Sequence, residues 1–173
     1  MTFFKILLLQ ATLYCCCCGF VHISDATMIA NLDRNAGSFA ELRGRVISDT
    51  QFTSISARGV ASPFTSSTAA MIQDGRGEMT TERYAEYIRL FELLGLQNGV
   101  TRSGGSVWFH AEARSWSNGS VTKGYVYSPE ELTPLVPDLD SFVPEPTPTA
   151  KGLGFTVFRM IKPHWYLYKI SDG

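Results

Sequence analysis

Residues 106–128 carry the side chains of this chain that could best do chemistry. His110 and Glu112 stand two residues apart, so on a strand they would lie side by side on one face. With His164 they could offer zinc two nitrogens and a carboxylate, leaving one position open for water. His-x-Glu alone is a short motif, and the paired cysteines of zinc deaminases are missing from the sequence. We therefore assign no catalytic residue, metal ligand or cofactor, and keep a small metal-dependent hydrolase as the alternative function.

The same stretch is expected to form a β-hairpin, because two β-like runs flank Asn118-Gly119. This dipeptide favours a tight type I′ turn. A two-residue turn there places Ser117 opposite Ser120. Counting outward then pairs Trp116 with Val121, Arg114 with Lys123, Glu112 with Tyr125 and His110 with Tyr127.

This register predicts two unlike faces. One is small and apolar, suited to a helix lying close, and holds Phe109, Ala111, Ala113, Gly124 and Val126. The other is the expected binding surface, formed by Trp108, His110, Glu112, Arg114, Trp116, Lys123, Tyr125 and Tyr127. Trp, Tyr and Arg supply much of the energy at protein interfaces. A further layer, such as a proline-rich loop, could instead bury these rings.

The N-terminus has the layout of an export signal. Lys5 precedes an apolar run, and the four cysteines follow as one block, Cys15 to Cys18. Leu13 stands three residues before Cys16, which makes Cys16 the first candidate for lipid modification, with Cys17 or Cys18 as alternatives. Residues 6–23 contain no Asp, Glu, Lys or Arg, so an uncleaved membrane anchor stays open. Cleavage and release is the third interpretation.

Composition narrows the functions of the remaining chain. All four cysteines lie before residue 19, which excludes disulfides, thiolate zinc sites and cysteine nucleophiles from the rest of the chain. The formal net charge of −1 gives no basic field for nucleic acid. We expect no nucleic-acid partner.

Helical periodicity appears twice before the hairpin. Ser24 to Ser48 repeats apolar residues at three- and four-residue steps, and Thr80 to Gly95 does so more clearly, with a Thr cap and a terminal Gly. Phe155 to Ile161 and Trp165 to Ile170 read as a second hairpin. We therefore predict an α+β fold, a four-stranded antiparallel meander of two hairpins with two helices packed on one face, preceded by the signal or anchor segment.

The expected domain organisation is simple. Residues 1–23 form the lipoprotein signal or membrane anchor, and residues 24–173 form a single α+β domain. Within that domain, residues 129–150 are acidic and hold six of the eight prolines, which predicts an extended loop.

Several phrases carry a resemblance over residues 80–170. They are TTERYAEYIRLFELLGL at 80–96, KGYVY at 123–127, LVPDLD at 135–140 and WYLY at 165–168. Together they resemble an uncharacterised group of small exported or lipoprotein-like proteins of Gram-negative bacteria. The resemblance implies a place in the cell envelope and no activity.

The sequence thus favours a binding protein over an enzyme. We expect a protein on the periplasmic side of the bacterial cell envelope, anchored by lipid or by a helix and bound to the membrane through its N-terminus. Its expected partner is an envelope protein or a secreted toxin, as for an accessory or an inhibitor/immunity protein. A purely structural envelope component is a third hypothesis.

Overall fold

The computed structural model describes residues 22–117, 119–144 and 154–172. Residues 1–21 of the expected signal or anchor, with the candidate Cys16, therefore lie outside the described residues, as do Asn118 and the side chain of Trp116. Within the described ranges, no helix has the length and apolar character needed to cross a bilayer.

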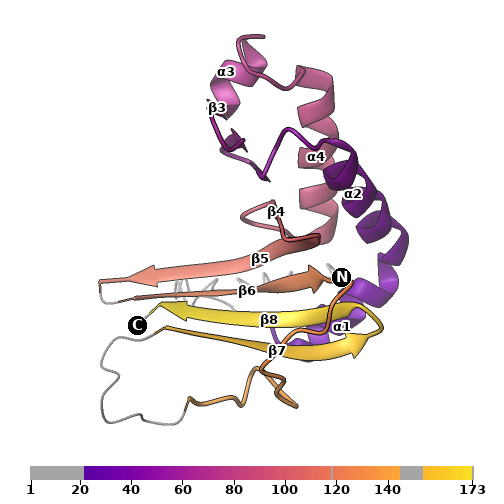
Figure 1. The fold of residues 1–173 in the computed structure, drawn as a ribbon, viewed down its shortest axis with the longest axis vertical. Helices are drawn as coiled ribbons and strands as arrows, with labels where there is room; N and C mark the ends of the chain where they lie inside the picture. Colours follow the sequence, from indigo (N-terminus) through magenta and orange to yellow (C-terminus); the bar gives the residue numbers. More distant parts are fainter. Residues whose placement is uncertain (1–21, 118, 145–153, 173) are drawn as a thin grey trace, which may run out of the picture.

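The described residues form an eight-stranded antiparallel sheet in the order β3-β2-β1-β4-β5-β6-β8-β7, which runs from top to bottom in Figure 1. Its strands are β1 (Ser54–Ser56), β2 (Gly59–Ala61), β3 (Ser66–Thr68), β4 (Val100–Ser103), β5 (Ser106–Trp116), β6 (Gly119–Tyr127), β7 (Phe155–Lys162) and β8 (Trp165–Asp172). The four helices are α1 (Asp25–Arg34), α2 (Ala36–Ser48), α3 (Ala69–Gln73) and α4 (Thr81–Leu94).

The prediction of a four-stranded meander with two helices is wrong. The four strands of the two hairpins exist, but β4 and the three-residue strands β1, β2 and β3 extend the sheet beyond β5. Strands of three or four residues, built here mainly from Ser, Thr, Gly and Val, are too short to display a periodic pattern. These strands are defined by their pairing: β1 pairs with β2 and with β4, and β2 pairs with β3.

The first predicted helix is divided at Asn35. This residue ends α1 and precedes α2 with φ −113° and ψ 25°, outside helical geometry, and its side-chain amide donates to Asn31 Oδ1 at 2.7 Å. Met28 and Leu42 are buried, whereas Arg43 lies over the ring of Tyr127.

The second predicted helix is confirmed as α4. Thr80 Oγ1 accepts from the backbone N–H of Arg83 at 3.2 Å, and Gly95 ends the helix in the left-handed region at φ 68°. Its buried stripe consists of Tyr84, Tyr87, Leu90, Phe91 and Leu94.

Aromatic packing defines the helix side of the sheet. Phe39 of α2 contacts Phe109 of β5 and Tyr125 of β6, with ring centroids 5.5 and 4.8 Å apart. On the opposite, outer side, Trp108 packs edge-on against Tyr168 at 5.0 Å, over buried Val126. The neighbouring residues Trp108 and Phe109 of β5 thus pack on opposite sides of the sheet.

A β-bulge in β5 sets the register of the central hairpin. Near the turn, Trp116 pairs with Gly119 and Arg114 with Val121, two residues away from the expected register. The register shifts between His110 and Glu112, beyond which His110 pairs with Gly124. The predicted pairs of Arg114 with Lys123, Glu112 with Tyr125 and His110 with Tyr127 are therefore wrong. A shift by an even number of residues keeps each side chain on its face, and the bulge adds the odd residue that changes the face.

The second hairpin is confirmed, with β7 and β8 joined around Pro163 and His164. The described part of the proline-rich loop lies along the outer edge of β7. The backbone N–H of Val136 donates to Phe158 O at 2.7 Å, and that of Phe158 donates to Pro134 O at 3.0 Å. These bonds cover part of an otherwise open strand edge.

Gly124 should be intolerant of a side chain. A Cβ at this position would lie 2.1 Å from Phe109 O and 2.8 Å from Tyr168 Cε1. We expect Gly124→Ala to lower the free energy of unfolding by about 1–3 kcal/mol or more, as in overpacked cores. Chemical denaturation measures this change. Gly44→Ala is the matched control, because no atom lies within 4 Å of its Cβ, and in a helix it should stabilise by up to about 1 kcal/mol. Equal effects of the two substitutions would contradict the close contact at Gly124.

Candidate functional site

The expected single binding surface is divided between the two sides of the sheet. Trp108 and His110 lie on the outer side, where both pack against Tyr168. Tyr125 and Tyr127 lie on the helix side, under Phe39 and Arg43. Lys123 and Glu112 also face the helix side, where they contact the chain entering α1, and Arg114 pairs with Glu112. The bulge between His110 and Glu112 is the physical reason for the division.

His110 is occupied by hydrogen bonds within the sheet. Its Nε2 lies 2.9 Å from Thr101 Oγ1, and its Nδ1 lies 2.5 Å from the hydroxyl of Tyr168. Burial lowers the pKa of His110 and raises the pKa of Tyr168. Both groups therefore favour their neutral forms, as expected of polar residues that stabilise a sheet.

The three candidate zinc ligands are not brought together. Glu112 Oε2 accepts from the backbone N–H of Ile23 at 3.1 Å on the helix side. His164 lies in the β7–β8 turn, with Nδ1 3.2 Å from Ser128 O. Among the described residues, the carboxylates close enough to share a metal ion are Asp25, Asp138 and Asp140.

Two of these three carboxylates already share a cation, the ammonium of Lys123. Lys123, 2% exposed, places Nζ 2.5 Å from Asp140 Oδ1 and 2.6 Å from Asp25 Oδ1, the latter an ionic contact rather than a well-directed hydrogen bond. Arg159 Nη1 lies 2.7 Å from Asp25 Oδ2. We call Asp25, Lys123, Asp140 and Arg159 the ion-pair cluster. Its ammonium and guanidinium groups neutralise the carboxylates that a metal would require.

The ion-pair cluster fastens the beginning of the described chain to the sheet. The backbone N–H of Asp25 donates to Asp140 Oδ2 at 2.7 Å, and Lys123 Nζ donates to Ile23 O at 3.0 Å. His22 Nε2 lies 2.8 Å from Asp140 Oδ1. Residues 22–25 are thereby bound to β6 and to the loop around Asp140.

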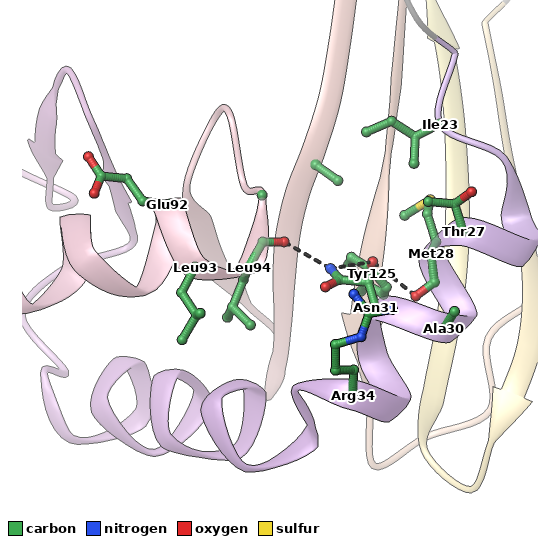
Figure 2. Close-up of a pocket in the computed structure, with 12 residues that line it drawn as sticks. Ile23, Thr27, Met28, Ala30, Asn31, Arg34, Glu92, Leu93, Leu94 and Tyr125 are labelled. Atoms are coloured by element: carbon green, nitrogen blue, oxygen red, sulfur yellow. Dashed lines mark hydrogen bonds between the residues drawn. The ribbon is translucent and has the colours of Figure 1, made fainter.

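Beside the cluster, a groove of about 580 Å³ opens between α1 and the end of α4. We call it the α1–α4 groove. Figure 2 shows Ile23, Thr27, Met28 and Ala30 along one wall and Leu93 and Leu94 along the other. Arg34 and Glu92 also line it, and Leu93 is 50% exposed. The lining is thus mainly apolar, with opposite charges in addition, a composition typical of binding sites.

Hydrogen bonds hold the floor of this groove in place. Asn31 Nδ2 donates to Leu94 O at 2.9 Å and to the Tyr125 hydroxyl at 3.1 Å, and that hydroxyl donates to Met28 O at 3.1 Å (Figure 2). Burial raises the pKa of Tyr125 to about 12, so the hydroxyl stays protonated. These bonds join α1, α4 and β6 and give the groove a preformed shape.

A second hollow of about 430 Å³ continues the groove past the end of α4. Ile23, Glu92 and Gly95 line both spaces. The second hollow adds Ala57, Ile88, Phe91, Leu96 and Gln97 to the lining. Ile23 therefore lies at the junction of two largely apolar spaces.

Sequence reasoning selected Lys123 and Tyr125 but assigned them to the wrong surroundings, and it missed Asp25, Asn31 and Arg159 as parts of this region. Asp25 lies 134 positions from its partner Arg159. Local spacing contains no signal for such a pair. The sequence features that could have indicated this region are a Lys within an apolar strand and Asp residues in a proline-rich loop.

Comparison with protein-family models, curated proteins and solved structures gives no match for this chain. The resemblance to exported proteins of Gram-negative bacteria therefore stays a prediction.

The charge of Lys123 should be essential to folding. We expect Lys123→Met to lower the free energy of unfolding by about 3–5 kcal/mol, because it leaves the Asp25 and Asp140 carboxylates without their shared ammonium. Lys169→Met is the matched control, since Lys169 lies opposite Lys123 on β8 and its Nζ donates to Leu139 O. Its loss should cost about 1 kcal/mol. Denaturant unfolding measures the loss in free energy of unfolding for both variants. Equal losses would contradict the importance of the cluster.

The ion-pair cluster should also make stability depend on acidic pH. Burial alone would raise the pKa of Asp140, but hydrogen bonds from Lys123, from the Asp25 backbone and from His22 outweigh it and lower this pKa to about 2. A lowered folded-state pKa stabilises the protein above the ordinary value of 3.8. That stability is lost as the pH falls through the interval from about 4 to about 2.

Urea unfolding at several pH values across that interval measures the effect. Asp140→Asn should be less stable near neutral pH and should lose less stability on acidification than the wild type. Parallel curves for the two proteins would show that Asp140 does not carry this pH dependence.

Proposed function

We propose that this chain is a membrane-tethered protein of the bacterial cell envelope that acts by non-covalent binding of a protein partner. The proposed site is the α1–α4 groove, and the proposed occupant is an apolar segment of the partner. An accessory protein or an inhibitor/immunity protein that neutralises a secreted toxin would act in this way. The observation that carries the proposal is the preformed, mainly apolar groove beside the point where the N-terminal segment joins the domain.

The state of the ionisable residues supports binding rather than catalysis. His110 is engaged by Thr101 and Tyr168, and Glu112 is engaged by Ile23 and Arg114. Lys123 is shared by two carboxylates. A general acid or base needs a free position facing a substrate, whereas these groups form their hydrogen bonds within the protein. We do not propose the metal-dependent hydrolase, because the bulge separates His110 from Glu112.

The groove suits an apolar peptide segment for two reasons. Leu93, which is 50% exposed, and the half-buried Ile23 lie on opposite walls (Figure 2), so an apolar side chain placed between them would be removed from water on both of its sides. Arg34 and Glu92 add opposite charges, which could orient the charged ends of such a segment.

The proposal predicts that a charge at Leu93 weakens binding. Partners would be captured from a Gram-negative envelope extract with the full chain, identified, purified and titrated by calorimetry against wild type and Leu93→Glu. A carboxylate within the apolar contact should raise the dissociation constant about tenfold or more. Since Leu93 is half exposed, this variant should keep its fold.

Ile47→Glu is the matched control, because Ile47 is 49% exposed on α2, away from the groove. It should bind as the wild type does. Equal affinity of the wild type and Leu93→Glu would reject the groove as the site. Loss of binding in Trp108→Ala instead would assign binding to the outer side of the sheet.

A further inference from the structure

The α1–α4 groove lies where the apolar N-terminal segment joins the domain. Ile23, the second described residue, lines both the groove and the adjoining hollow. The residues just before it belong to a stretch, 6–23, that holds no Asp, Glu, Lys or Arg. The end of this stretch and the groove therefore meet at Ile23.

The direction of the chain at this junction is held by specific contacts. The backbone N–H of Ile23 donates to Glu112 Oε2, and Ile23 O accepts from Lys123 Nζ. His22 contacts Asp140 at the next position outward. Residues 22 and 23 are therefore attached firmly to the domain.

An apolar segment attached at this point has a large advantage over a free ligand. Covalent linkage gives it an effective concentration in the millimolar range for short connections. Sixteen residues, 6–21, can reach roughly 50 Å, well beyond the groove. Burying Leu, Ile and Phe side chains yields about 1.5–3 kcal/mol each, and the groove beside Ile23 offers an apolar surface in immediate reach.

We propose that, in the chain that retains residues 1–21, part of the apolar stretch 6–21 occupies the α1–α4 groove. This inference rests on the proposed function, since it names the regulation of the same site. A partner must then displace the chain's own segment, or meet a chain from which the segment has been cut or drawn into a membrane. The N-terminus thus acts as a built-in competitor for the groove.

The distribution of cysteines allows a direct test in the full chain. All four cysteines lie at positions 15–18, so one introduced cysteine reports contact with the N-terminal segment. Leu93→Cys places a thiol at the groove. Ser141→Cys is the matched control, an exposed position next to Asp140, which contacts His22, and outside the lining of the groove. Both thiols lie within reach of a loose segment.

The reduced proteins would be treated with a short bis-maleimide, digested and analysed by mass spectrometry for links between the introduced cysteine and residues 15–18. Occupation of the groove should make the link from Leu93→Cys form about tenfold faster or more than the link from Ser141→Cys. The rate should be independent of protein concentration. Equal rates at the two positions would overturn the proposal, and so would a link that forms only between two copies of the chain.

The crosslinking experiment tests whether the chain's own segment occupies the groove, and the partner titration tests the proposed function. Either result can be negative without the other. Linked Leu93→Cys protein should lose affinity for the partner, whereas linked Ser141→Cys protein should keep it. A Leu93-specific link with no partner binding in any form would leave the segment in the groove and reject the proposed function. Partner binding that Leu93→Glu weakens, with equal crosslinking at both positions, would keep the function and reject self-occupation.

Discussion

The single extra residue in β5 decides what each side of the sheet carries. Before the register shift, His110 belongs to the outer layer with Trp108 and Tyr168. After it, Glu112 pairs with Lys123 and faces the helix side. Without the bulge, the alternation of β5 would place His110 and Glu112 together.

The buried ammonium of Lys123 lies on the same side of the sheet as Glu112. Removing a charge from water is costly, and Lys123 is 2% exposed, so the Asp25 and Asp140 carboxylates must compensate for its desolvation. The two Asp residues are 115 positions apart in the sequence. The cluster therefore ties the start of α1 and the proline-rich loop to β6, a long-range closure that local helix or hairpin formation cannot achieve.

The groove depends on that closure. Its walls belong to α1 and α4, and their separation is set by Asn31, which bonds to both the end of α4 and Tyr125. The ion-pair cluster holds Ile23 at the junction with the second hollow. A preformed space with these polar supports can bind an apolar segment at a lower ordering cost than a flexible surface can. The same supports hold residues 22 and 23 beside the groove.

Local patterns in the sequence determined the elements whose signals are complete within a short window. The helix of α4 followed from its Thr cap, its apolar stripe and Gly95, and the β7–β8 hairpin followed from two β-rich runs around Pro163. The division of Ser24–Ser48 at Asn35 and the three-residue strands had no comparable signal, because their geometry comes from neighbours far along the chain.

For the site, the sequence by itself determined which residues were unusual: the ionisable and aromatic side chains of residues 108–127 and the absence of cysteine after residue 18. Only the tertiary structure decided which of them meet. One inserted residue put His110 and Glu112 on opposite sides of the sheet, and contacts across more than 100 positions brought Asp25 to Arg159. Side-chain type is a property of one position, whereas register and long-range pairing are settled by the free energy of the whole packed chain.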